Sequence, residues 1–410
     1  MAVNFLNNRE VSDLCLGKPP LRWISVGATV AETLAALKRS GESHVSVWSC
    51  SADHSSRKLP LDSTGNEESL IRCKCVGKIC MSDVICFLCR DESLENPFKA
   101  LEAPISQLLI KAPPSVVGHL EPNSRLLQAI DYMLEGTQNL VIPIENHLSR
   151  NPRKKFMNKP APFCSAPHNG REYCWITQED VLRFLLNSIS VFSPIPTFTI
   201  ESLNMIDHDI MTVHYNEPAS PVLDCISRSL MEQTSVAVID ENGRLIGEIS
   251  PFTLACCDET VAAAIATLSA GDLMAYIDCG GPPEDLIQLV KRRLVEKNLH
   301  GMLDLMEECS TSPLPSSSSS SEDESAAPGK YGGSVRYSPG RRSEAIVCYP
   351  WSSLVAVMIQ ALAHRVSCVW VVEEDHTLVG HVTFESMLKV FRSVSGNHRH
   401  KQEPENSAKL

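Results

Sequence analysis

Thr177 and Asp180 are three positions apart, at a point where a strand-like run passes directly into a helical pattern. The N-terminus of a helix presents free N–H groups that bind phosphate, and an aspartate at this spacing can accept hydrogen bonds from both hydroxyls of a ribose. Thr177 would then contact the phosphate and Asp180 the ribose. A threonine at the N-cap with an acid at N3 is also an ordinary capping arrangement. Both interpretations stay open, and one pair of residues can satisfy both.

The same junction recurs three times with altered residues, as Cys80 with Asp83, Ser250 with Thr253, and Thr383 with Ser386. A thiol is a weaker polar group than a hydroxyl, and the last two copies have no acid at the ribose position. Any nucleotide is therefore expected to bind in the N-terminal half, with Asp180 as the preferred ribose acceptor and Asp83 as the second. The primary candidates are Thr177, Asp180, Asp83 and Cys80, and the secondary candidates are Arg183, Arg90, Ser250 and Thr383.

Each junction ends a larger unit that reads helix, strand, strand, helix. In the first unit, Thr29 and Glu32 predict a capped helix start, and the strand that follows covers residues 44–48. In the third unit, residues 241–244 predict a tight hairpin turn between two strands. Internal repetition of this kind predicts four copies of one supersecondary unit.

A repeat of this order, ending in Gly-x-hydrophobic-Thr/Ser-x-x-Asp, resembles the CBS domain. Residues 11–20 and 367–372 are similar to the plant CBSX-type proteins, which have two CBS pairs. The resemblance implies an α/β fold of α+β type repeats, in which four CBS repeats form two CBS-pair (Bateman) modules. In that family the clefts of a pair bind adenosine compounds. Similarity to the gamma subunits of SNF1/AMP-activated kinases is more distant and mainly architectural.

The pattern divides the chain into repeats and connecting segments. We expect CBS repeats at 11–92 (with an insert at about 51–70), 101–190 (insert at about 145–171), 200–269 and 344–393. A helical connector is expected at 270–309, a disordered serine-rich acidic linker at 310–343 and a disordered tail at 394–410. The linker contains candidate phosphorylation sites with acidic, proline or basic neighbours, namely Ser319, Ser320, Ser321, Ser338 and Ser343.

Composition narrows the classes of function. The 410 residues carry a formal charge of -12, which argues against non-specific binding to nucleic acid or to an anionic membrane. No signal peptide, transit peptide or membrane-spanning stretch is evident. The 16 cysteines of a chain without a signal peptide are expected to be reduced and mostly buried. These features favour a cytoplasmic protein, with the nucleus as the alternative.

Other chemistry is not favoured by the sequence. Glycine-rich phosphate loops and zinc-protease motifs are missing, so the chain is not expected to be an enzyme. Cys73, Cys75, Cys80, Cys86 and Cys89 lie close together in the sequence. Cys86 and Cys89 form a Cys-x-x-Cys on a predicted helix, where cysteine usually packs as a small apolar residue. No second pair follows at zinc-finger spacing, so no metal site is expected. No firm cofactor is expected either, and AMP, ADP or ATP is the class of regulatory ligand.

Two hypotheses remain. The first is a non-catalytic regulator that senses an adenosine nucleotide in the N-terminal pair and modulates a protein partner. The second is a ligand-free interaction scaffold, or a gamma-like subunit of an SNF1-related kinase complex. The resemblance implies a kinase complex or a thioredoxin-type protein as partner, and either a monomer with an internal disc of CBS pairs or a homodimer.

Overall fold

The computed structural model describes residues 2–40, 43–50, 73–109, 116–144, 168, 171–278, 281–311 and 345–396. The two predicted inserts and the serine-rich linker fall almost wholly outside these residues. The predicted phosphorylation sites Ser319, Ser320, Ser321, Ser338 and Ser343, and most of the predicted tail, also lie outside them.

Each repeat forms a three-stranded sheet. The strands are β1 (Trp23–Ser25), β2 (His44–Cys50) and β3 (Cys73–Cys80) in repeat 1, β4 (Val117–His119), β5 (Asn139–Ile144) and β6 (Glu172–Thr177) in repeat 2, β7 (Thr212–His214), β8 (Val236–Ile239) and β9 (Leu245–Ile249) in repeat 3, and β10 (Val347–Cys348), β11 (Cys368–Val372) and β12 (Leu378–Thr383) in repeat 4. In every sheet the first strand is parallel to the second, and the second is antiparallel to the third. The predicted α/β architecture of four repeats is confirmed. The short parallel strand was not predicted, because two or three residues are too few to show a period-2 pattern.

The helices lie between and around these sheets. They are α1 (Ala2–Asn7), α2 (Ser12–Cys15), α3 (Val30–Ser40), α4 (Met81–Leu88), α5 (Asp91–Glu95), α6 (Pro97–Glu102), α7 (Ser106–Leu109), α8 (Leu126–Leu134), α9 (Gln178–Asn187), α10 (Val222–Glu232), α11 (Pro251–Ala255), α12 (Val261–Thr267), α13 (Ala270–Tyr276), α14 (Glu284–Glu296), α15 (His300–Thr311), α16 (Leu354–His364) and α17 (Phe384–Gly396), with 3₁₀ turns η2 (Ile189–Phe192) and η3 (Ile195–Thr197). The predicted cap at α3 is confirmed: the Glu32 carboxylate accepts the Thr29 N–H at 2.9 Å, and the Thr29 hydroxyl accepts the Glu32 N–H at 3.1 Å.

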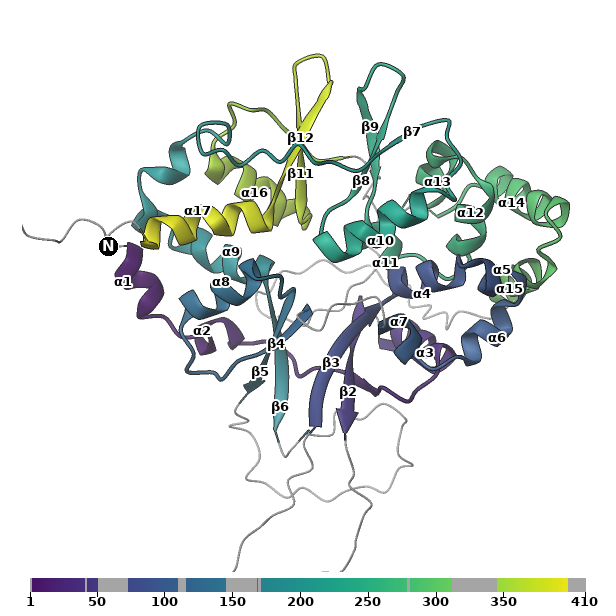
Figure 1. Ribbon diagram of the computed structural model, residues 1–410, viewed down its shortest axis with the longest axis horizontal. Coiled ribbons are helices and arrows are strands. Elements are labelled where there is room, and N and C mark those ends of the chain that lie inside the picture. The colour runs from purple at the N-terminus through teal and green to yellow at the C-terminus, as the bar shows by residue number, and fades with distance from the viewer. Residues whose placement is uncertain are drawn as a thin grey trace, which may run out of the picture.

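The four repeats pack together through two kinds of contact (Figure 1). The sheets of repeats 1 and 2 meet in an aromatic cluster that includes Trp48, Val141 and Trp175, and those of repeats 3 and 4 meet around Ala237 and Trp370. The helices pair the repeats differently from the sheets. They form one large core shared by repeats 1 and 3 and a second core shared by repeats 2 and 4. Each pair of sheets is thus held to the other pair by two helical cores.

The segment before β1 crosses from one repeat to another. Val11 N–H donates to the Ser124 carbonyl at 2.8 Å, and Leu14 packs in the core shared by repeats 2 and 4. Further on, Leu21 N–H donates to the Tyr173 carbonyl on β6 at 2.8 Å. Residues of this segment are therefore placed beside repeat 2 before the chain enters the sheet of repeat 1.

A similar crossing in the C-terminal half places a backbone against Gly380. Asp207 and His381 exchange backbone hydrogen bonds of 2.9 Å, so the segment that precedes β7 lies along the edge of β12. A Cβ at position 380 would overlap the Asp207 carbonyl oxygen and lie 2.7 Å from Ile206 Cγ2. Glycine is required here by the close approach of a second backbone.

We expect Gly380→Ala to lower the free energy of unfolding by about 1–2 kcal/mol, because β12 or the segment that precedes β7 must shift to admit the methyl group. Gly27→Ala is the matched control, since its Cβ would meet only Ser25 Oγ, at 3.8 Å. Urea unfolding followed by circular dichroism measures both variants. Equal stability of the two variants would contradict the close approach at Gly380.

Among the residues that the structure describes, no helix is long and apolar enough to cross a membrane.

Candidate functional site: the strand-to-helix junctions

Thr177 and Asp180 close the start of α9 reciprocally. The Asp180 carboxylate accepts the Thr177 N–H at 2.8 Å and the Thr177 hydroxyl hydrogen at 2.9 Å, both on Oδ2. The Asp180 N–H in turn donates to Thr177 Oγ1 at 3.3 Å. The capping interpretation is thus satisfied in full, and Asp180 keeps its second oxygen, Oδ1, outside these contacts.

Lys18 adds a charge to this junction from far away in the sequence. Its Nζ lies 2.7 Å from Asp180 Oδ2, and the two side chains are 24% and 23% exposed. A partly buried ion pair is less screened by solvent than a surface pair. The position that a ribose hydroxyl would take on Oδ2 is therefore held by a cation of the chain itself.

The first junction has a related arrangement with a thiol. Asp83 Oδ2 accepts the Cys80 N–H at 2.8 Å and lies 3.1 Å from the Cys80 sulfur. Burial raises the pKa of Asp83, although the hydrogen bonds from Cys80 and the charge of Lys78 oppose that shift. Burial also lowers the pKa of Lys78 and raises that of Cys80. Asp83 and Lys78 are thus poorly solvated.

His44 connects the two junctions of the N-terminal pair. It lies opposite Cys80 in the β2–β3 register, and its ring centroid is 6.1 Å from that of Trp175 on β6. Burial, followed by the positive charges of Lys78 and Lys18, lowers the pKa of His44 to about 3. Both lysines are therefore close enough to act on one neutral imidazole.

The two C-terminal junctions start helices with hydroxyls alone. Ser250 Oγ accepts the Phe252 N–H at 3.2 Å, while Ser386 Oγ accepts the Thr383 N–H at 3.1 Å and Thr383 Oγ1 accepts the Ser386 N–H at 3.2 Å. These contacts are caps. They supply no carboxylate for a ribose.

The sheet interface of the C-terminal pair is filled by an aromatic residue. Trp370 is fully buried between the sheets, and its Nε1–H donates to Glu248 Oε2 at 2.7 Å. His381 packs edge-on against the Trp370 ring at 5.8 Å between centroids. A buried glutamate is tolerated here because it accepts a hydrogen bond.

The predicted basic residues have partners of their own. Arg183 forms an ion pair with Glu179 one turn earlier on α9, and the Arg90 guanidinium lies over the Phe87 ring at 4.7 Å. Neither contact is with one of the junction carboxylates, Asp83 or Asp180.

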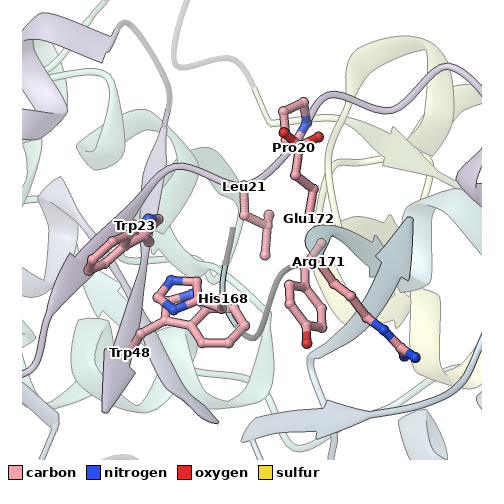
Figure 2. Close-up of a pocket in the computed structure, with 8 residues that line it drawn as sticks. Pro20, Leu21, Trp23, Trp48, His168, Arg171 and Glu172 are labelled. Atoms are coloured by element: carbon pink, nitrogen blue, oxygen red, sulfur yellow. The ribbon is translucent and has the colours of Figure 1, made fainter. Parts of the chain in front are cut away.

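A small aromatic pocket lies at the opposite end of the N-terminal sheets (Figure 2). Trp23, Trp48, His168 and Tyr173 line it, and its volume is about 10 Å³. That volume suits a single water molecule, whereas drug-sized ligands need about 300 Å³ or more. This cavity is therefore too small to hold a nucleotide.

Sequence reasoning missed Lys18, Lys78 and His44. None belongs to the Thr/Ser-x-x-Asp pattern, and Lys18 lies 2.7 Å from Asp180 only because the segment before β1 crosses to repeat 2. A motif defined by residue spacing detects contacts within one turn of a helix. It cannot detect a partner that is distant in the sequence, as Lys18 is from Asp180.

Four three-stranded units, paired through their sheets and joined through their helices, define the class as a protein built of two paired α/β modules. Comparison with known proteins agrees. The chain is 46% identical over 408 residues to the CBS domain-containing protein CBSX5 of Arabidopsis thaliana, covering 97% of this chain and 100% of that protein. The chain therefore belongs to the CBS domain-containing proteins, as the sequence predicted.

Two more distant proteins are also similar to this chain, one in sequence and one in fold. The SNF1-related protein kinase regulatory subunit gamma-like PV42b of Arabidopsis thaliana is 21% identical over 78% of this chain and 76% of its own length. A crystal structure from Methanocaldococcus jannaschii, of a proposed archaeal homolog of g-AMPK, has a TM-score of 0.51 at 14% identity, covering 93% of this chain and all of that one. This likeness shows the fold alone. No protein-family model matches the chain.

Proposed function

We propose that this protein is a non-catalytic regulator that senses an adenosine nucleotide in its N-terminal CBS pair and modulates a protein partner. The observation that carries the proposal is the charge at the junctions. Repeats 1 and 2 place Asp83 and Asp180 at helix starts, with Lys78 and Lys18 beside them. The corresponding starts in repeats 3 and 4 have hydroxyl caps.

Asp180 is the proposed ribose acceptor, and the N-terminus of α9 with Thr177 is the proposed phosphate contact. Lys18 gives this site a means of responding to the ligand. A ribose that takes Asp180 Oδ2 displaces the Lys18 ammonium, which is then free to meet the phosphate. Asp83 with Cys80 is the second proposed site.

Displacing Lys18 would act on the segment that carries it. Helix α2 packs against β6 and α9, and Val11 N–H donates to the Ser124 carbonyl. A ligand that binds better with Lys18 released therefore favours a different packing of this segment, which is the differential affinity that regulation requires.

Partners follow from similarity rather than from a contact in the chain. The gamma-like relative supports an SNF1-related kinase complex as partner. The resemblance to plant CBSX-type proteins implies a thioredoxin-type protein as the other candidate. We propose that the four repeats of one chain form an internal disc of CBS pairs in a monomer, with a homodimer as the alternative.

The second candidate function is a ligand-free interaction scaffold, or a gamma-like regulatory subunit of an SNF1-related kinase complex. One observation favours it: the Lys18 ammonium already neutralises Asp180 at 2.7 Å. If the pair were too stable to be opened, the junction would serve folding alone.

Titration distinguishes the two functions. We expect AMP, ADP or ATP to raise the melting temperature of the full chain and to give a binding isotherm by calorimetry, with S-adenosylmethionine as the comparison ligand. Asp180→Asn keeps the shape of the cap and removes the charge. It should weaken binding about 10- to 100-fold, because a hydrogen bond to a charged group contributes about 1.5–3 kcal/mol.

Ser386→Ala is the matched control at the equivalent position of repeat 4, and we expect it to leave binding unchanged. Unchanged binding in an Asp83→Asn, Asp180→Asn double variant would show that the nucleotide site lies elsewhere. A wild-type chain that responds to none of the four ligands would support the scaffold instead.

A further inference from the structure

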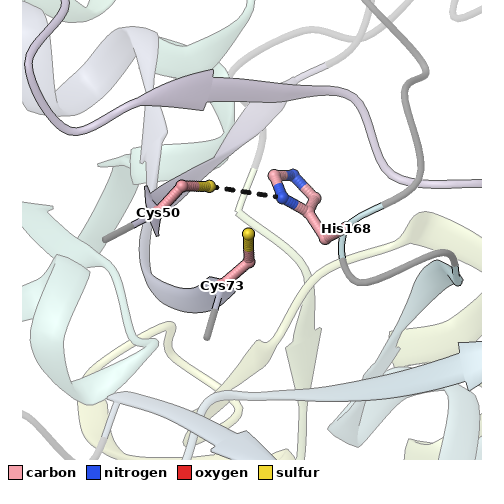
Figure 3. A group of neighbouring side chains, drawn as sticks. All are labelled: Cys50, Cys73 and His168. Carbon is pink, nitrogen blue, oxygen red and sulfur yellow. Dashed lines mark hydrogen bonds between the residues drawn. The ribbon is translucent and has the colours of Figure 1, made fainter. Parts of the chain in front are cut away.

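Three metal-binding side chains meet at the end of the first sheet that lies away from the nucleotide junction. Cys50 is the last residue of β2, Cys73 is the first residue of β3, and the two are direct partners in the antiparallel register. His168 approaches them from the chain that enters β6 of repeat 2 (Figure 3). Cys80, by contrast, is at the other end of β3.

The spacing of the donor atoms suits a tetrahedral metal ion. The ligand atoms of the three residues all lie within 4.8 Å of one another, and Cys50 Sγ is 3.5 Å from His168 Nδ1. In tetrahedral zinc, bonds of about 2.3 Å to sulfur and about 2.0–2.1 Å to nitrogen place those two atoms about 3.5 Å apart. The cysteine and the histidine are therefore already at coordination distance from a common centre.

His168 is fixed in position by aromatic residues. Its ring stacks on Trp48 at 3.8 Å between centroids and 4° between planes, and meets Trp23 edge-on at 4.3 Å. The residue is 6% exposed, and its Nε2 has no hydrogen-bond partner among the described residues. Nδ1 faces the cysteines, as Figure 3 shows. Nδ1 is thus the nitrogen in position to bind a metal ion, and Nε2 would then carry the ring proton.

The protonation chemistry of the three groups is compatible with coordination. Burial lowers the pKa of His168, a direction that favours the neutral imidazole which coordinates metals. Partial burial and the neighbouring Cys73 raise the pKa of Cys50 to about 11, so the Cys50 thiol holds its proton when no cation is present. A metal ion would displace that proton, because the thiolate is the form that coordinates.

We propose that Cys50, Cys73 and His168 form a binding site for a divalent, thiol-preferring metal ion, with zinc as the best fit. Two sulfurs and one imidazole are ligands that select zinc over magnesium or calcium. The three residues leave one position of a tetrahedral ion for water or another ligand.

Such a site would join two repeats. Cys50 and Cys73 belong to repeat 1, and Arg171 N–H donates to the His168 carbonyl at 3.0 Å, next to β6 of repeat 2. A bound ion would fix the two sheets to each other at one end while their other end remains the proposed nucleotide site. The sequence expectation of no metal site weighed Cys73 only within the group that contains Cys86 and Cys89, and it did not consider Cys50 or His168.

The experiment uses the full chain, purified with a reductant and freed of metal by chelation. We expect about one equivalent of Zn²⁺ by elemental analysis after reloading and desalting. Co²⁺ should give visible d–d bands of a tetrahedral ion and a near-ultraviolet thiolate charge-transfer band. Because removing even an outer-shell partner of a metal lowers affinity about 10- to 100-fold, Cys50→Ser and Cys73→Ser should lower zinc affinity by more than about 100-fold.

Cys225→Ser, a substitution of a half-buried cysteine on α10, is the matched control and should keep the full equivalent of zinc. Circular dichroism checks that each variant is folded. Cys50 is exposed, so Cys50→Ser is the substitution least able to disturb the fold. His168→Ala should remove the nitrogen ligand and shift the Co²⁺ bands. Zinc retained in a Cys50→Ser, Cys73→Ser double variant would overturn the site, as would a reduced wild-type chain that binds no zinc or cobalt.

Discussion

Trp370→Ala should lower the free energy of unfolding by about 3–5 kcal/mol, which is the range for removing a fully buried large aromatic side chain. Trp370 is 0% exposed and lies at the centre of the interface between the sheets of repeats 3 and 4. The substitution also removes the Nε1–H that donates to Glu248 at 2.7 Å, so a buried carboxylate loses a donor. Both losses act on the same interface.

Trp351→Ala is the matched control, because the same substitution removes a side chain that is 51% exposed. We expect its effect to be below about 1 kcal/mol, a value typical of exposed positions. Equilibrium unfolding in guanidinium chloride measures the difference. Trp370→Ala with a stability near that of Trp351→Ala would show that the sheet interface of the C-terminal pair is not tightly packed.

His44→Gln should flatten the acid limb of the stability curve. The pKa of His44 is about 3 in the folded protein and 6.5 in the reference state, so the unfolded chain binds a proton between these values and the folded chain does not. Stability therefore falls as pH falls from 6.5 towards 3. At about 1.4 kcal/mol per unit, and allowing for partial solvent screening of a half-buried side chain, the wild type should lose about 2–3 kcal/mol more than the variant by pH 4.

The titration of Asp83 also changes stability with pH, so the effect of His44 has to be measured as a difference between wild type and His44→Gln. The pKa of Asp83 is raised by burial, so its titration favours the folded state as pH falls, with the opposite sign to His44. The difference between wild type and His44→Gln, measured as unfolding free energy from pH 7 to pH 4, isolates the histidine. His214→Gln, at an exposed position, should leave the wild-type curve unchanged. Parallel curves for wild type and His44→Gln would show that His44 is accessible to protons in the folded state.

Local patterns predicted the features whose partners are close in sequence. Thr29 with Glu32 and Thr177 with Asp180 cap their helices as expected, because a cap involves backbone and side chains within one turn. The hairpin turn before Leu245 also forms, with Gly243 at φ 74° as a tight turn requires. The repeat itself is visible for the same reason, since each copy carries its own caps, turns and apolar stripe.

The sequence by itself thus determined the repeat, its local caps and the family, and it singled out the junction at Thr177 and Asp180. Only the tertiary structure decided what meets each junction: Lys18 at Asp180, the two lysines around His44, and His168 beside Cys50 and Cys73. Those encounters depend on how chain segments cross between repeats and on which sheets pack together. The spacing of residues along the chain does not predict these contacts, because contacts between distant segments depend on the burial of whole helix and sheet faces rather than on any one residue pair.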